Sequence, residues 1–475
     1  MTVAIFDDKT SSLERIAFPF LRSKQIKTHL MVILLYLFAS VVLFNSILIH
    51  GLGVSQPLTG GGDFGLSVLN MAWLPFAILH GKNIFYSNYQ FALHGINMMG
   101  TPAYFTQALV MLPITLLFGP VVSTNIAIIL GPVVTAFSSY IVYYKITKSR
   151  YGSILSGLVL GFSILVVNDS VYGHFHVTWI FGPPIIFYIY YLVVTKVEIS
   201  VIKYGTWLGI ICSLQFYGST ELITTTLFFY GIFGLFIAVL ERRLVRDRLR
   251  RIVAVSCVGG LISILLCGYA IYFFLFGKDH VFFNNGRYSN PIFKLGVTDL
   301  FLPLDRLNLG LKLMSNNFSK VSIPIVVLAT IVLLGRYLWR QKIARYCLMF
   351  CIFIYFCMIG PDLRIFPMQN LLPNPIYYLL MHTPVISNTL FVRYIYFFTF
   401  FCNFGFIIAL KRLDQSLKHV VARPRRLFSI KYLMASCKSK RNKYCRFFYS
   451  CNFGYCSSSA SAYYNIRNFQ EIINF

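Results

Sequence analysis

Long apolar runs separated by short polar connections make up most of this 475-residue chain. A run of about 20 apolar residues is enough for a helix to cross a bilayer. The runs are continuous and do not alternate between apolar and polar residues, so they predict helices and not the strands of a membrane barrel. The expected fold is an all-α polytopic membrane protein with about 11 transmembrane helices. The predicted spans are residues 29–52, 103–119, 121–144, 152–168, 176–196, 204–217, 219–240, 252–276, 321–339, 344–360 and 389–410.

The balance of residue types strengthens this assignment. Hydrophobic residues make up 57% of the chain and charged residues 12%, and the mean hydropathy is +0.69. A soluble domain is about half apolar and about a quarter charged, so the shortage of charge is the stronger sign of a membrane protein. The eleven cysteines form no CxxC pair, and their spacing therefore points to no metal cluster.

The net charge of +27 comes from lysines and arginines that gather in short runs beside the apolar spans. This is the distribution of cytoplasmic loops under the positive-inside rule. Contact with anionic lipids therefore explains the charge better than nucleic-acid binding. The basic runs are residues 22–27, 145–150, 241–251, 340–345 and 411–412.

The same charges predict the orientation of the chain in the plasma (cytoplasmic) membrane. Residues 1–28 are expected in the cytoplasm, with 29–52 as an uncleaved signal anchor. The integral membrane domain then runs over residues 29–412. Its three long connections are expected outside, and their glycines, prolines and asparagines predict short helices at the membrane surface. These outer loops are residues 53–102, 277–320 and 361–388.

One stretch conflicts with this orientation. The basic run at 145–150 requires an odd number of crossings in residues 103–144, whereas the apolar pattern predicts two spans there. Either 105–118 is re-entrant, or segment 66–81 of the first outer loop also crosses.

Carboxylates are scarce in this chain, and several of them fall on the predicted outer face together with two histidines and two arginines. This gathering predicts that the protein works at that face. Asp63 is the most conspicuous, because it follows the glycines of the stretch TGGGDFG. Glycine lets backbone approach a ligand closely. The helix predicted after it, at 66–80, is either part of such a site or an interfacial helix that closes the bundle. The outer group comprises Asp63, Glu221, Asp279, Asp299, Asp305, Asp362, His174, His176, Arg364 and Arg393.

The first outer loop also resembles a known family. After Asp63 and a helix with Trp73 come HGKNIFYS (80–87) and HGINMMGTP (94–102), which lead into the next apolar span. This order is similar to that in the GT-C superfamily of membrane glycosyltransferases, including its uncharacterised bacterial and archaeal members. Further matches are LFGP at 117–120, VYGHFHVTWIFGPP at 171–184 and LLPNPIYYLLMHTPVISNTLFVRY at 371–394.

The resemblance implies a GT-C-like architecture and an activity. Such enzymes transfer a sugar from a polyprenyl-phosphate-linked donor to an envelope glycan, lipid or protein at the outer membrane face. Asp63 matches the acidic residue that serves there as general base, since the acceptor hydroxyl loses its proton as the bond forms. Its neighbours are Gly62 and Phe64, so the paired acids of a metal-binding motif are missing. No cofactor or divalent metal is therefore expected.

Five further residues are candidates for binding the substrate, each with a plainer alternative. His174 and His176 either contact the lipid phosphate or the sugar, or are interfacial histidines that end a helix. Glu221 is either functional, as ionisable groups near membranes commonly are, or a helix-start carboxylate beside Ser219 and Thr220. Arg393, and less so Arg364, either bind phosphate or extend toward the interface.

Two alternatives to the transferase stay open. A transporter or lipid flippase would show inverted repeats and broken helices at mid-membrane. A catalytically inactive membrane protein stays open because of the tail, residues 413–475, which is basic, carries four of the cysteines and lacks a lasting helical period. This tail is either out of frame or truncated, or it is a cytoplasmic segment on anionic lipid.

Overall fold

A computed structural model of the chain describes residues 23–54, 63–89, 94–101, 104–279, 323–363, 372–383 and 386–427. The chain divides into two compact units, residues 1–411 and 412–475. The packing and the site described below lie in the first unit. The last helix begins in the first unit and ends in the second.

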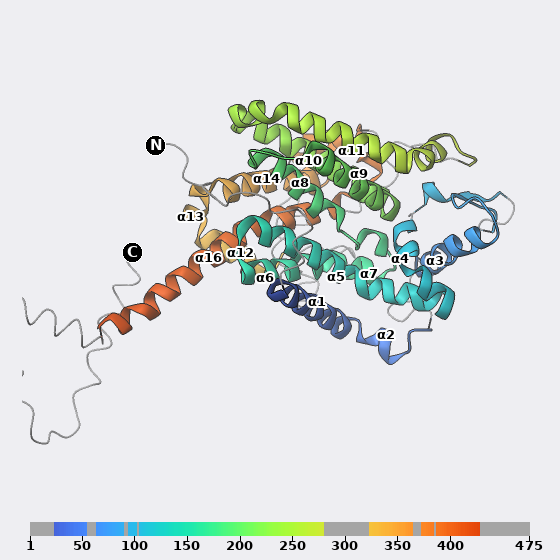
Figure 1. Cartoon of the computed structure of the whole chain (residues 1–475), viewed down its shortest axis with the longest axis horizontal. Helices are drawn as coiled ribbons and strands as arrows, with labels where there is room; N and C mark the ends of the chain where they lie inside the picture. The colour runs from blue at the N-terminus through green and yellow to red at the C-terminus, as the bar shows by residue number, and fades with distance from the viewer. Residues whose placement is uncertain are drawn as a thin grey trace, which may run out of the picture. The chain divides into compact units, whose positions relative to one another are not determined.

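Helices account for most of the described residues (Figure 1), as the apolar pattern predicts. They are α1 (Ser23–Leu43), α2 (Asn45–Ile49), α3 (Asp63–Leu79), α4 (Phe105–Phe118), α5 (Pro120–Thr147), α6 (Arg150–Gly161), α7 (Ile164–Val171), α8 (Gly182–Thr195), α9 (Val201–Gly218), α10 (Thr220–Leu240), α11 (Arg242–Phe276), α12 (Ile325–Leu333), α13 (Gly335–Arg340), α14 (Lys342–Met358), α15 (Pro375–Met381) and α16 (Ile395–Leu427). Short 3-10 turns are η1 (Met98–Gly100), η2 (Phe175–Val177), η4 (Ile386–Asn388) and η5 (Phe391–Tyr394).

Two small antiparallel hairpins complete the described structure. In the first, β1 (Tyr86–Ser87) pairs with β2 (Ile96–Asn97), with Tyr86 opposite Asn97. In the second, β3 (Asp362–Leu363) pairs with β4 (Leu372–Pro373). Both hairpins belong to segments expected as outer loops.

Within the described residues, six helical segments are long and apolar enough to cross a membrane, in agreement with an all-α polytopic membrane protein. A seventh is added if α6 and α7, which bend by 41° at their junction, form one span. The number of about 11 is not confirmed, because the other expected spans are helical but shorter, broken or less apolar. The six are 25–43, 120–147, 175–195, 220–240, 242–276 and 391–416.

The tail differs from its expectation at its start. Helix α16 continues past Arg412 to Leu427, so this part of the tail is helical. The stretch contains three arginines and three leucines, which favour helix. The rest of the tail lies outside the described residues.

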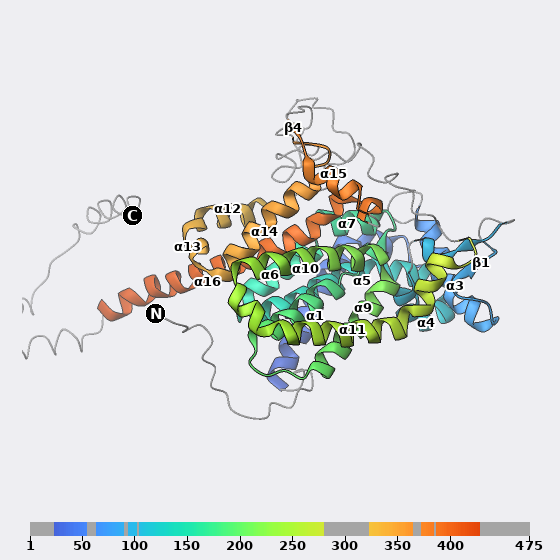
Figure 2. The same cartoon turned by 90° about the horizontal axis from the view of Figure 1, so that it is seen from above.

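Helix α10 separates two carboxylates, Glu221 and Glu241. Glu221 is in the first turn of α10 and Glu241 follows its last residue, so they lie about 30 Å apart along the helix at about 1.5 Å per residue. Glu241 accepts a hydrogen bond from Lys342 of α14 at 2.7 Å. In Figures 1 and 2, α3 and α4 lie at one end of this unit and α13 at the other. The basic connection around Lys342 is therefore remote from the end where α10 begins.

Aromatic side chains form the largest core. Helix α16 supplies Phe397 and Phe401, whose rings lie 4.9 Å from Phe229 of α10 and 5.1 Å from Phe350 of α14. Ring contacts of this kind add to the energy of burial. They fix the start of α16 between α10 and α14, and so place the residues just before it.

Small residues allow α9 and α11 to pack closely. A Cβ added to Gly209 would lie 2.6 Å from Cβ of Ile262 and 2.7 Å from the carbonyl oxygen of Gly259. Gly205, four residues earlier, meets Val258 of α11 in the same way. Such spacing of small residues lets membrane helices approach backbone to backbone.

We expect Gly209→Leu to destabilise the protein by about 1–3 kcal/mol, because the new side chain has no room against α11. Thermal unfolding in detergent measures the effect. Gly260→Leu is the matched control, since Gly260 of α11 has open space where its Cβ would be. Equal stability of the two variants would contradict the close packing.

Candidate functional site

Asp63 is the first residue of α3, where its carboxylate complements the positive end of the helix dipole. Phe64, the next residue, is buried in a cluster that includes Tyr104 and Phe175. The side chain of Asp63 itself is 54% exposed. Burial of Phe64 thus fixes the helix start, while the neighbouring carboxylate stays accessible.

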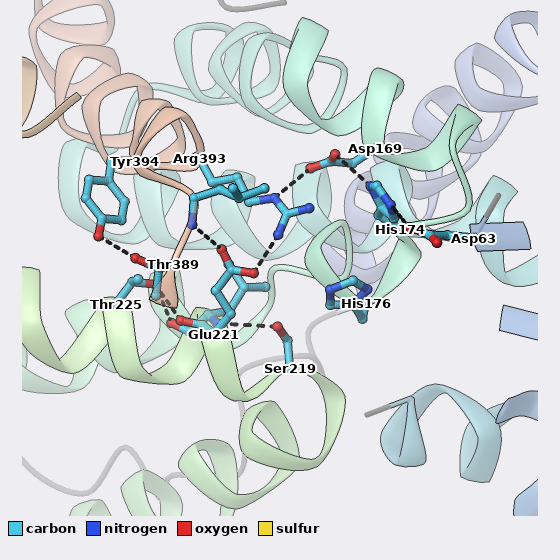
Figure 3. Close-up of polar contacts among 12 residues, drawn as sticks. Asp63, Asp169, His174, His176, Ser219, Glu221, Thr225, Thr389, Arg393 and Tyr394 are labelled. Carbon is cyan, nitrogen blue, oxygen red and sulfur yellow. Dashed lines mark hydrogen bonds and ion pairs between the residues drawn. The ribbon is translucent and has the colours of Figure 1, made fainter. Parts of the chain in front are cut away.

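The turn after α7 brings His174 to Asp63. Gly173 has φ +84, a value that side chains disfavour, and its amide donates to the carbonyl of Ser170 at 3.2 Å. The His174 amide then donates to the carbonyl of Asp169 at 2.7 Å. Nε2 of His174 pairs with Oδ2 of Asp63, and its Nδ1 lies 3.4 Å from Oδ1 of Asp169 (Figure 3). One imidazole therefore bridges two carboxylates from different helices.

The chain of charges continues through Arg393 of η5. Its Nε lies 3.4 Å from Oδ2 of Asp169, and its Nη1 donates to Oε2 of Glu221 at 2.5 Å. Glu221 also accepts from the amide of Leu390 at 3.3 Å. The result is a series of five charged side chains, the charge chain: Asp63, His174, Asp169, Arg393 and Glu221 (Figure 3).

Along the charge chain, side-chain exposure falls from Asp63 to Asp169 and rises again toward Glu221. The side chain of Asp63 is 54% exposed, that of His174 26% and that of Asp169 9%. Arg393 is 13% exposed and Glu221 20%. Asp63 is thus the member that is most accessible to a substrate. His174 contacts it on its buried side, and the other members follow His174 in series.

The charge state of His174 follows from these neighbours. Burial by itself lowers the pKa of His174, but the hydrogen bond and charge of Asp169 and the hydrogen bond to Asp63 outweigh it, and the net pKa is raised. Arg393 acts in the opposite direction. The imidazolium form therefore persists to a higher pH than in free histidine, and in that form both ring nitrogens donate to carboxylates.

A second set of hydrogen bonds holds the turn against α3. The carbonyl of Gly173 accepts from Oγ of Ser67 at 2.6 Å and from the hydroxyl of Tyr104 at 3.3 Å. The same Tyr104 hydroxyl lies 3.2 Å from Nδ1 of His176, which is buried. Because η2 is a tight turn, His174 and His176 face different partners, with ring centroids 6.2 Å apart.

The residues that carry the family resemblance in the first loop hold that loop together. Nε1 of Trp73 donates to the carbonyl of Ile84 at 2.8 Å. Nδ2 of Asn97 donates to the carbonyl of Phe273 in α11 at 2.9 Å. These contacts tie the loop to itself and to the end of α11. Their role in the structure is local support.

The structure brings four of the six predicted site residues into one series. Asp63 pairs with His174 and Glu221 with Arg393, whereas His176 lies beside the series against Tyr104. Glu221 is also a helix-start carboxylate with Ser219 as N-cap, as in its plainer alternative. Arg364 lies outside the described residues, as do Asp299 and Asp305.

Asp169 is the residue that the sequence reasoning missed. It joins the Asp63–His174 pair to the Arg393–Glu221 pair. In the sequence it follows a predicted span and looks like a polar helix end. The signal that could have found it is a carboxylate five positions before His174 in a chain with only 15 acidic residues.

Among the described residues, no group of three or more histidine, cysteine, aspartate or glutamate side chains is arranged to hold a metal ion. Asp169 faces His174 and Arg393, and not Asp63 directly. The expectation of chemistry without a divalent metal stays a prediction.

Comparison with known proteins identifies no family. No protein-family model matches the chain, and no curated protein matches it either. The resemblance to GT-C enzymes therefore rests on the motifs alone, and the function has to be inferred from the geometry of the charge chain.

Proposed function

We propose that the protein is a membrane glycosyltransferase with Asp63 as its general base. It would transfer a sugar from a polyprenyl-phosphate-linked donor to an envelope glycan, lipid or protein at the outer face of the plasma membrane. The observation that carries the proposal is the half-exposed carboxylate of Asp63, held from behind by His174 at the end of the unit remote from the basic connection around Lys342.

The proposed reaction is a direct displacement at the anomeric carbon. The acceptor oxygen forms a bond to that carbon while the bond from the carbon to the phosphate oxygen breaks, and the lipid phosphate leaves with the electron pair. The acceptor proton passes to Asp63. Its Oδ2 pairs with His174, whereas no described residue bonds to its Oδ1, which leaves that oxygen to take the proton.

The charge of His174 suits this role. The imidazolium places a positive charge beside Asp63 and pairs with its Oδ2. It also fixes the direction of the carboxylate, so that less freedom is lost when the acceptor binds. Lipid phosphate would be recognised by other groups, because Arg393 is already shared by Asp169 and Glu221.

The position of the charged residues favours a transferase over a transporter. Glu221 is in the first turn of α10, and Arg393 precedes α16, so both stand at helix starts. A transporter would instead carry its polar site near the middle of the membrane.

The test is a strain that lacks the gene, analysed by mass spectrometry of its lipid-linked sugars and envelope glycans. We expect a lipid-linked sugar to accumulate and a glycan to lose that sugar. The wild-type gene should restore both, and Asp63→Asn, at equal abundance in the membrane, should restore neither, because an amide cannot accept the proton. Glu198→Gln, which alters an exposed carboxylate in the connection between α8 and α9, is the control and should restore both.

A second step separates transfer from transport. Detergent extracts of the deletion strain, which contain the accumulated donor, are incubated with the purified protein. A transferase consumes the donor in detergent, whereas a flippase has no bilayer across which to act. An unchanged glycan profile on deletion would refute the function, and full restoration by Asp63→Asn would refute the assignment of the base.

A further inference from the structure

Asp169 is a buried carboxylate that the proposed reaction does not use. Its side chain is 9% exposed, and burial of an ionised carboxylate is costly unless it is paired. Arg393 does not need Asp169 as its only partner, because Glu221 already binds the guanidinium at 2.5 Å. What Asp169 adds is its contact with Nδ1 of His174 at 3.4 Å.

Asp169 holds His174 in two ways. Its carbonyl accepts from the backbone amide of His174 at 2.7 Å, which fixes the main chain. Its carboxylate faces Nδ1, which fixes the rotation of the ring. With Nδ1 directed at Asp169, the opposite nitrogen Nε2 is directed at Asp63.

The rest of the charge chain keeps Asp169 itself in place. Oδ2 of Asp169 makes no hydrogen bond within the described part of the chain, but lies 3.4 Å from Nε of Arg393. Arg393 is held in turn by Glu221 at the start of α10. The position of His174 therefore depends on three helix ends that are far apart in the sequence.

We propose that Asp169 is a positioning residue of this site: its carboxylate orients His174, and the two together hold Asp63 toward the substrate. The role of the pair in transfer rests on the proposed function. The orientation of His174 by Asp169 does not, and it is open to measurement without any substrate.

The proposed transfer leaves the number of protons in the site unchanged. Before transfer, His174 carries protons on both ring nitrogens, one directed at Asp169 and one at Asp63. Asp63 takes the acceptor proton during transfer and later returns it to water on its exposed side. His174 keeps its protons throughout, so its part is to orient Asp63 and to stabilise its charge. This is how a buried carboxylate commonly serves a histidine beside a reacting group.

Several groups face His174, and each affects its titration. Asp63 faces it from α3, Asp169 from α7 and Arg393 from η5, and the His176 ring lies 6.2 Å away in η2. The two carboxylates favour the charged imidazole, whereas burial and Arg393 oppose it. Removing the charge of Asp169 should therefore shift the balance toward neutral histidine.

The experiment is nuclear magnetic resonance of the full-length protein in lipid nanodiscs, with histidine rings labelled with ¹⁵N and ¹³C. His174→Gln identifies the His174 signals by their loss. In the wild type we expect His174 to titrate above free histidine, and to carry its remaining proton on Nδ1 once it is neutral. In Asp169→Asn its pKa should fall by about 1 or more, and Asp247→Asn, a change to an exposed carboxylate of α11, should leave it unchanged.

An unchanged His174 pKa in folded Asp169→Asn would overturn the proposal. The wild-type measurement tests it even if that variant does not fold, because a neutral His174 protonated on Nε2 and not on Nδ1 would also overturn it. In the transfer assay, Asp169→Asn and His174→Gln should each lower the rate, and the double variant should be no worse than His174→Gln alone.

The two proposals fail separately. If Asp63→Asn restores the glycan while Asp169→Asn still lowers the His174 pKa, the function is wrong and the positioning is right. If Asp63→Asn abolishes transfer while Asp169→Asn leaves the His174 pKa unchanged, the function is right and the positioning is wrong.

Discussion

Arg393→Met is expected to destabilise the protein by about 3–5 kcal/mol, as measured by thermal unfolding in detergent. Methionine keeps most of the volume of arginine but removes its charge. Glu221, whose side chain is 20% exposed, would then lose its cation, and Asp169, which is 9% exposed, would keep only His174. Removing one partner of a buried ion pair leaves an uncompensated charge, which costs far more than the pair contributes.

The matched control is Lys342→Met, which breaks the pair between Lys342 and Glu241 near the other end of α10. That pair is more exposed, at 61% and 24%, and should contribute less than about 1 kcal/mol. A further variant adds Glu221→Gln to Arg393→Met. It should recover part of the lost stability, because the unpaired carboxylate of Glu221 is gone. Equal loss in Arg393→Met and Lys342→Met would contradict the burial of the charge chain.

Gly173→Ala is the second large effect, with an expected loss of about 2–4 kcal/mol. Two causes add. The backbone at φ +84 is unfavourable for any residue with a Cβ, and that Cβ would lie 2.9 Å from Cα and 3.0 Å from N of Phe64. Both atoms belong to backbone at the start of α3 and cannot rotate away, so the turn must separate from the helix.

That separation should also remove His174 from Asp63, because His174 is the next residue. We therefore expect the pKa of His174, measured by nuclear magnetic resonance, to move toward that of free histidine in Gly173→Ala. This should hold even at a temperature where the variant is folded. Gly51→Ala is the control: its φ is +92, but its Cβ would make only an ordinary contact of 3.9 Å with Val54. It isolates the backbone cost, and an identical loss in both variants would argue against the contact with α3.

The sequence predicts the helical membrane class well and the number of spans less well. Apolar runs mark each helix, but they do not reveal where a helix breaks. The run 152–168 is a bent pair, α6 and α7, and the run 321–339 is split into α12 and α13. Length and composition are sums over a window, whereas a break depends on how neighbouring helices pack at one position.

Asp63, His174, Glu221 and Arg393 could be singled out from the sequence because ionisable side chains are rare in so apolar a chain. Their partners could not. His174 and Asp63 are 111 positions apart, and Arg393 and Glu221 are 172 positions apart. Asp169 was overlooked because nothing around it distinguishes a buried acid from a polar residue that ends a helix.

By itself, then, the sequence determined that this protein is built from apolar helices and that its few acidic groups include Asp63 on a glycine-rich connection. Hydrophobic periodicity and the scarcity of charge are local properties, so they can be read along the chain. The tertiary structure alone decided that Asp63 does not stand alone: His174, Asp169, Arg393 and Glu221 follow it in one series. That arrangement arises when helix ends distant in sequence pack together, because buried charges are stable only where a partner from another helix meets them.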